Sequence, residues 1–458
     1  MLARELSTED FGLVGALLVF QAFASLFVDS GFSYALIQRK RPSRLDYSTV
    51  LWFNLALAGL CYAILALCAP WIADIFQGDR RLVPLGRVMF LAIILNAACI
   101  VQVNRLMKAM DVRMVAVSNS LGLVIGGVVG IALAFTGFGA WAIVWQTVAI
   151  AAVKVLVLWT SSRWRPLWRF SWRALRSYAR LGTRMLATSF LNTVFLNIYS
   201  FLIGNRVGLS ALGYYSQSDK WSKMGITSIS QVLTSSFVPA LSAVQDTPER
   251  FRVLVSKMNR FTAYIVFPAM FGLMCMAESI FHALFGAKWD PSIILFQILV
   301  LRGIFVVLNS LYTNYQLALG HGNIIMRLEV FRDAVAIIAL VITFPYMGLS
   351  TEADPVEGLR ILLWGQLAAT VLTTIVSVVL TARLTGLSFG RFIVDNVPYL
   401  AQTLLIAPVM IFAATFVANS WLKIAVMTFV GLGLYLGGNY IFGSAIQRDA
   451  IRYLRGRM

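Results

Sequence analysis

The sequence predicts an all-α protein that crosses a membrane many times, and composition, segment length and charge placement support this. Of its 458 residues, 59% are hydrophobic and only 13% are charged, whereas a soluble domain carries about 25% charged residues. Apolar segments of roughly 18 or more residues recur along the chain, and each can cross a hydrocarbon core of about 30 Å as a helix. The alternating segments of roughly ten residues that are typical of a β-barrel are absent from the sequence. We therefore predict a polytopic helical membrane protein.

Thirteen apolar spans are predicted, and the loops between them are too short to contain a large soluble domain. Two sets of glycines spaced four residues apart predict close packing between helices: Gly122, Gly126 and Gly130 in one span, and Gly433 and Gly437 in another. The spans are expected at residues 11–37, 48–73, 83–104, 115–136, 139–160, 181–203, 213–241, 256–278, 291–317, 327–345, 359–382, 397–417 and 421–442.

The basic residues predict the orientation of the chain. The net charge is +18, and one alternating set of loops holds 26 of the 38 Lys and Arg residues, against eight in the opposite set. The richer set of loops is expected to be cytoplasmic, and so is the C-terminus. This topology accounts for the net positive charge without a nucleic-acid partner. This orientation leaves the N-terminus outside, although residues 1–10 hold no signal peptide. We therefore expect either a further span before residue 1 in the full gene product or a start codon assigned too far downstream.

The segment 161–180 is predicted to be a basic cytoplasmic linker. Arginines recur through it every two to four residues, interleaved with aromatic residues and with no acid among them. This spacing favours an amphipathic helix on an anionic membrane surface. The alternative is that the linker gathers a negatively charged, lipid-linked substrate. The arginines are Arg163, Arg165, Arg169, Arg173, Arg176 and Arg180, and Arg184 follows them.

An internal repeat predicts how the spans are grouped. Phe-Gly-Leu-Val at 11–14 opens the first span, and Leu-Gly-Tyr-Tyr at 212–215 opens the seventh. A separation of six spans indicates a parallel repeat of two six-helix bundles plus a C-terminal helix pair, an architecture suited to alternating access. The first bundle is one helix short, which also points to a missing first helix. The expected regions are 1–160 (N-terminal lobe), 161–180 (linker), 181–382 (C-terminal lobe) and 383–458 (helix pair and basic tail).

Several of these segments resemble the polysaccharide transporter family, the Wzx-type flippases of the multidrug/oligosaccharidyl-lipid/polysaccharide superfamily. The resemblance is carried by Ser-Thr-Glu-Asp-Phe-Gly-Leu-Val at 7–14, Leu-Ile-Gln-Arg-Lys at 36–40, Leu-Gly-Tyr-Tyr at 212–215 and Val-Pro-Ala-Leu-Ser at 238–242. It covers most of the chain and is strongest from 1 to 290. It implies a fold of fourteen helices, which thirteen visible spans and one missing span would match.

The resemblance also implies a function, partners and a location. The family moves undecaprenyl-pyrophosphate-linked oligosaccharide repeat units across the bacterial cytoplasmic (inner) membrane, for exopolysaccharide, capsule or O-antigen (lipopolysaccharide) synthesis. The expected partners are that lipid-linked glycan, the membrane lipids and the polysaccharide polymerase and chain-length machinery. No cofactor and no catalytic residue are expected, because the sequence holds no enzyme motif and no metal-ligand pattern. The four cysteines lie inside apolar segments and are expected to be packing residues.

Polar and charged residues inside the spans are the candidate site, because an ionisable side chain at membrane depth costs at least about 2.5–3.5 kcal/mol. Arg302 is the first choice for binding pyrophosphate or an acidic sugar, and Asn309 is expected on the same helix face. The alternative for Arg302 is a buried pair with an acid on a neighbouring helix. Lys220 and Lys223 are expected to line a substrate cavity, although Lys223 can instead pair with Asp219 four residues earlier.

Two acids inside the spans are candidates for ion coupling. Asp29 and Asp219 can bind a cation or a proton, whereas the alternative for Asp29 is a bond to the backbone. Lys154 is expected to extend towards the interface.

The runner-up function is a cation-coupled exporter of small organic cations on the same fold. It would need an acidic cavity, whereas basic groups outnumber acids inside these spans.

Overall fold

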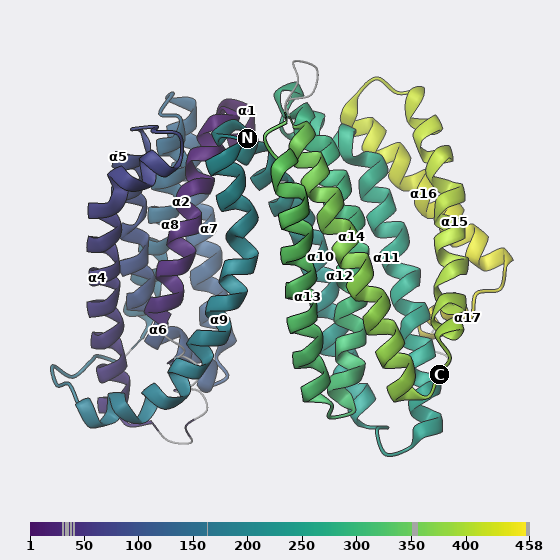
Figure 1. Ribbon diagram of the computed structural model, residues 1–458, viewed down its shortest axis with the longest axis horizontal. Coiled ribbons are helices and arrows are strands. Elements are labelled where there is room, and N and C mark those ends of the chain that lie inside the picture. Colours follow the sequence, from purple (N-terminus) through teal and green to yellow (C-terminus); the bar gives the residue numbers. More distant parts are fainter. Residues whose placement is uncertain are drawn as a thin grey trace. The chain divides into compact units, whose positions relative to one another are not determined.

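The computed structural model describes residues 1–29, 32, 36, 39, 42–162, 164–349 and 356–454, and every regular element in them is a helix. The chain forms two compact units, Met1–Ser216 and Gln217–Met458, with the division inside helix α10 (Leu209–Ser242). Figure 1 shows the long helices of each unit running alongside one another. The expected all-helical architecture is therefore confirmed for the part of the chain that is described.

The first unit is built from helices that precede α10. α7 and α8 pack most closely, because glycines on α7 let the backbones approach: a Cβ at Gly126 would lie 2.3 Å from a side-chain carbon of Ile150, and one at Gly122 would lie 3.0 Å from the Ile150 carbonyl oxygen. The helices are α1 (Leu2–Glu5), α2 (Thr8–Asp29), α4 (Arg44–Ile75), α5 (Leu82–Met89), α6 (Leu91–Lys108), α7 (Val112–Phe135), α8 (Ala140–Ser161) and α9 (Trp172–Arg206).

The second unit packs around α11 and α12. Its buried core contains three large aromatic side chains, Trp289, Tyr312 and Tyr315. Gly433 and Gly437 lie on α16, and a Cβ at either position would have no neighbouring atom of the described residues within 4 Å, so the close packing expected there is wrong. The helices are α11 (Pro248–Leu284), η1 (Ala287–Trp289), α12 (Asp290–Ala318), α13 (Gly322–Thr343), η2 (Phe344–Tyr346), α14 (Glu357–Thr385), α15 (Phe389–Thr415), α16 (Ser420–Ile441) and α17 (Ala445–Leu454).

Each of the thirteen predicted spans falls on helix, and ten helical segments within the described residues are long and apolar enough to cross a membrane. α9, α10 and α13 are not among those ten, so the count of thirteen remains a prediction. The span expected at 83–104 is interrupted at Phe90, between α5 and α6. The span expected at 11–37 is described as helix from Thr8 to Asp29; residues 30, 31, 33–35 and 37 lie outside the described residues.

Only the second half of the linker at 161–180 is helical, in α9, so the helix expected from its arginine spacing is wrong for residues 164–171. Residues 164–171 are not helical, because Pro166 disfavours helix at the residue before it and cannot donate a backbone hydrogen bond. Helix resumes only at α9, where the Ser171 hydroxyl accepts a bond from the Ala174 amide at 3.3 Å and caps the N-terminus. Arg163 and the side chains of Arg180 and Arg184 lie outside the described residues.

Residues 164–171 form an extended strap that is held against α4. The Leu167 amide donates to the Ser48 hydroxyl at 2.9 Å, and the Trp52 indole donates to the Leu167 carbonyl at 2.8 Å. The Trp52 ring also lies 4.6 Å from that of Trp168, between centroids. These contacts fix the connection between α8 and α9.

The glycines of the two repeat motifs approach each other's helices reciprocally. A Cβ at Gly12 would lie 1.8 Å from the Leu209 carbonyl oxygen, and one at Gly213 would lie 2.0 Å from the Thr8 carbonyl oxygen. Each glycine therefore faces the residue four positions before the other glycine. A twofold relation between the two motifs would produce this pattern, and glycine is required because any side chain would clash with backbone.

Candidate functional site

Arg302 lies on the face of α12 that packs against α14. Its Nε donates to the Thr370 hydroxyl at 3.1 Å, and the side chain is partly buried. Among the residues that the structure describes, no carboxylate forms an ion pair with it. The acid partner considered as an alternative is therefore not found in the described part of the chain. One hydroxyl accepts a single bond, whereas a guanidinium carries five N–H donors.

Two further polar residues follow Arg302 along the same face of α12. The Asn309 amide donates to the Thr374 hydroxyl at 2.8 Å, and the Gln316 amide donates to the Thr381 hydroxyl at 3.0 Å. A spacing of seven residues is close to two helical turns, so all three donors face α14. The shared face of Arg302 and Asn309 agrees with the spacing argument.

The threonines of α14 were not identified from the sequence. Thr370 and Thr374 also donate to carbonyl oxygens one turn earlier on their own helix, at 2.8 and 2.7 Å. Each hydroxyl can therefore satisfy its own hydrogen and still accept a bond from α12. Their four-residue spacing in an apolar helix was the only available signal, and it does not specify the partner helix.

The predicted cationic residues of α10 differ in their surroundings. Lys223 forms an ion pair with Asp219 at 2.6 Å, as the four-residue spacing allows, and the Asp219 side chain is only 17% exposed. Lys220 is exposed. The same helix carries further exposed polar residues, namely Thr227, Ser228, Gln231 and Ser235.

A polar pocket of about 370 Å³ lies within the first unit, between α2, α6 and α8. Asp29 and Lys154 both line it, so a carboxylate and an ammonium share one cavity although they are far apart in sequence. Lys154, expected to extend to the interface, instead faces this pocket. Uncharged polar side chains complete the lining: Ser25, Asn96 and Asn104.

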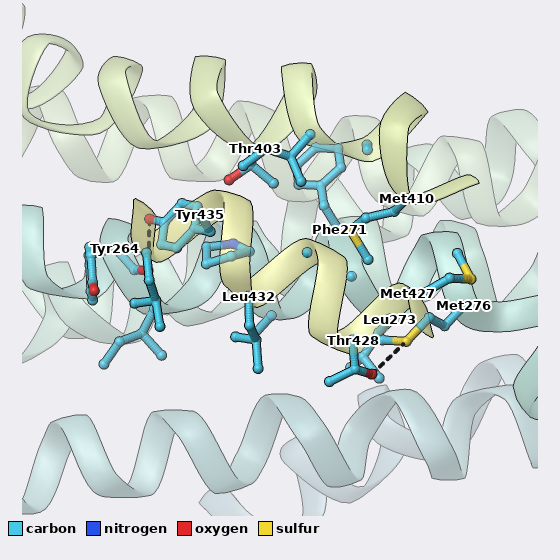
Figure 2. A pocket seen from close by; sticks show the side chains of 18 residues that line it. Tyr264, Phe271, Leu273, Met276, Thr403, Met410, Met427, Thr428, Leu432 and Tyr435 are labelled. Atoms are coloured by element: carbon cyan, nitrogen blue, oxygen red, sulfur yellow. Dashed lines mark hydrogen bonds between the residues drawn. The ribbon is translucent and has the colours of Figure 1, made fainter. Parts of the chain in front are cut away.

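An apolar pocket of about 530 Å³ lies within the second unit, between α11, α15 and α16. Figure 2 shows its lining, with Phe271 and Met276 from α11, Met410 from α15 and Leu432 from α16. Pro268 on α11 also lines it, and a proline inside a helix removes one backbone hydrogen bond. No sequence signal indicated this pocket, because three separate helices form it.

The fold places the protein in a known structural class of membrane proteins. The solved structure of the lipid II flippase MurJ in an inward closed conformation matches 98% of this chain and 94% of its own, with a TM-score of 0.71 and 14% identity. An inward-facing multidrug resistance MATE family transporter of the MOP superfamily matches 84% of this chain and 92% of its own, with a TM-score of 0.63 and 15% identity. These likenesses show a MurJ- and MATE-like helical fold.

The family model described as "Polysaccharide biosynthesis protein" matches residues 1–294, and the chain belongs to this family. The family resemblance stated from the sequence motifs is thereby confirmed, including its concentration in the first 290 residues.

Curated relatives agree with this assignment. The succinoglycan biosynthesis transport protein ExoT of Rhizobium meliloti (strain 1021) is 27% identical over 63% of this chain and 58% of its own length. The lipopolysaccharide biosynthesis protein WzxC of Escherichia coli (strain K12) is 25% identical over 75% of this chain and 70% of its own. The teichuronic acid biosynthesis protein TuaB of Bacillus subtilis (strain 168) is 27% identical over 66% of this chain and 63% of its own. The chain thus spans between 58% and 70% of these relatives.

Proposed function

We propose that this protein is a flippase that moves undecaprenyl-pyrophosphate-linked oligosaccharide repeat units from the inner to the outer leaflet of the bacterial cytoplasmic membrane, by alternating access. It would supply exopolysaccharide, capsule or O-antigen synthesis, and work beside a polysaccharide polymerase and chain-length machinery. The C-terminus would be cytoplasmic. No covalent step is needed, because a hydrated head group crosses a membrane slowly and a polar route removes that barrier. Family membership and the transport roles named for ExoT support this class of function.

The proposal depends on a single observation, the hydrogen bonding of the Arg302 guanidinium. In the described residues its guanidinium has one hydroxyl acceptor and no carboxylate, so four N–H donors are available to a ligand. A diphosphate offers paired oxygens at the spacing that a guanidinium fork matches. Asn309 would contribute on the same face, and Lys220 and Lys223 would add positive field, Lys220 more strongly because Asp219 already pairs with Lys223.

The apolar pocket of Figure 2 has the lining that a hydrocarbon chain requires, and we assign it to part of the polyprenyl tail. Burying a methylene group contributes about 0.8 kcal/mol. A tail held in the second unit would keep its pyrophosphate in the unit that carries Arg302.

Ion coupling is assigned to Asp29 in the polar pocket of the first unit, since a carboxylate that lines a cavity can exchange a proton or a cation. Asp219 is the second candidate, although its carboxylate already forms an ion pair with Lys223. The position of Asp29 in this pocket also favours the rival function, an exporter of small organic cations. Lys154 in the same pocket counts against that rival, because it reduces the attraction for a cation.

The first test is genetic and biochemical. A strain lacking the gene should accumulate lipid-linked repeat units on the inner leaflet and export no polymer. Arg302→Ala should lower polymer export at least about tenfold, because a hydrogen bond to a charged group contributes about 1.5–3 kcal/mol. Arg206→Ala, which removes an exposed arginine at the end of α9, is the matched control and should export normally.

The outcomes separate the function from the site. If the deletion strain exports polymer normally, the flippase proposal is wrong. If only Arg302→Ala exports normally while the protein reaches wild-type levels in the membrane, the function stands and the assignment of Arg302 is wrong.

A further inference from the structure

A basic pocket of about 390 Å³ lies in the second unit, where α11 meets the loop between α14 and α15. Among the described residues, two arginines and two serines supply its polar lining and no acidic residue lines it: Arg252, Ser256, Ser388 and Arg391. It contains none of the residues assigned above to the substrate. The loop at 383–395 belongs to the set that the charge distribution predicts to be cytoplasmic.

The backbone around the pocket is fixed by the turn between the two helices. α14 ends at Thr385 and is followed by Gly386, whose φ of +68° favours glycine. The Arg252 Nε donates to the Thr385 carbonyl at 2.9 Å, and a Cβ at Gly386 would lie 2.5 Å from the Arg252 Nη2. Ser388 then caps α15 by accepting a bond from the Arg391 amide at 3.3 Å. The positive end of the α15 dipole therefore lies beside the two guanidinium groups.

Positive charge exceeds negative charge around this pocket. The buried carboxylate of Asp395 is 2.6 Å from the Arg260 Nε and 3.5 Å from the Arg391 Nε, and it also accepts a bond from the Ser256 hydroxyl. One carboxylate thus serves two guanidinium groups, and in the described part of the chain no carboxylate pairs with Arg252.

Lys257, which follows Ser256 on α11, is already neutralised by an acid. The Lys257 ammonium lies 2.7 Å from the Asp449 carboxylate, and this contact lowers the pKa of Asp449. The excess charge at the pocket therefore belongs to Arg252 and Arg391.

We propose that this pocket binds a phosphate group, carried either by an anionic phospholipid or by a soluble phosphate. Each arginine uses its Nε on the protein, which leaves the four N–H groups of its terminal nitrogens for a ligand. Two guanidinium groups, the Ser388 hydroxyl and a helix N-terminus are a donor set that suits a phosphate, whereas the Ser256 hydroxyl already donates to Asp395. The proposal is independent of flipping, because it concerns a different set of residues.

The test is a binding measurement on the full-length protein, purified in a neutral detergent and stripped of lipid. Native mass spectrometry would measure phosphatidylglycerol binding, with phosphatidylcholine as the neutral lipid and inorganic phosphate or pyrophosphate as soluble competitors. Arg252→Gln with Arg391→Gln should lower the affinity for the anionic ligand at least about tenfold for each lost contact. Arg173→Gln, which removes an exposed arginine of α9, is the matched control.

A second pair of variants leaves the arginines and their structural contacts in place. Leu387→Asp puts a negative charge into the pocket lining, whereas Leu387→Asn has nearly the same shape and no charge. The aspartate variant should lose phosphate binding at least about tenfold relative to the asparagine variant, because a like charge repels the ligand.

Competition by inorganic phosphate or pyrophosphate would identify a soluble phosphate as the ligand. Phosphatidylglycerol binding that these anions leave unchanged would identify a lipid head group. The proposal is overturned if neither class binds, if the double arginine variant and Leu387→Asp bind as wild type does, or if Arg173→Gln loses as much affinity as they do.

Discussion

The two units hold their polar residues at membrane depth in different ways. In the first unit, Asp29 and Lys154 line a polar pocket of about 370 Å³. In the second unit, Arg302, Asn309 and Gln316 bond to threonine hydroxyls across the contact between α12 and α14, and the pocket of about 530 Å³ in the same unit is apolar. Polar side chains in an apolar helix can therefore either open a cavity or fasten two helices together.

The role of a polar residue inside an apolar helix depends on which of these two surroundings it has. A carboxylate in a cavity can exchange an ion, whereas an amide bonded to a hydroxyl mainly fixes the register of two helices. Arg302 can both fix the two helices and bind a ligand, because its one bond to Thr370 leaves most of its N–H donors unused.

The largest effect is expected from separating the two charges of the first pocket. Asp29→Asn or Lys154→Met alone should destabilise the protein by about 2 kcal/mol, because each variant leaves one charge in the shared pocket without the opposite one. The double variant should cost less than the sum of the two. Thermal unfolding of the four proteins in detergent measures this coupling, and strictly additive effects would show that the two charges do not interact.

A moderate effect is expected from filling the apolar pocket of the second unit. Ala269→Phe places a ring in the cavity and should displace about two methylene groups of a bound chain, about 1.6 kcal/mol or about tenfold in affinity. Polymer export should fall while the thermal stability stays near that of the wild type. Ala334→Phe on an exposed face of α13 is the control; equal export by the two variants would contradict a tail-binding role.

The smallest effect is expected from the contact between α12 and α14. Gln316→Leu removes one bond to Thr381, and such bonds contribute about 0.6 kcal/mol on average in membranes. The buried Oε1 of Gln316 has no partner among the described residues, so its removal offsets part of that loss. Thermal stability should change by less than about 1 kcal/mol and export should stay normal. A loss of export in a stable Gln316→Leu protein would assign the whole contact to transport.

Part of this arrangement could be predicted from the sequence. Each predicted span falls on a helix, because span length and hydropathy are local properties that a bilayer constrains directly. The common face of Arg302 and Asn309 also follows from helical spacing. The break at Phe90 has no signal in hydropathy, because the residues around it are as apolar as the helices on either side. The extended strap at 164–171 differs from the expected helix because Pro166 disfavours helix there.

The helical membrane class, the family and the residues whose charge is costly in a bilayer can all be predicted from the sequence, because each depends on composition or on short segments. The partners of these residues depend on how the helices pack: Thr370 for Arg302, the pocket that Lys154 shares with Asp29, and the turn at Gly386 that brings Arg252 beside Arg391. The residues that meet in these contacts and pockets are between 68 and 139 positions apart in the chain. Side-chain packing between helices sets them, and no local pattern encodes it.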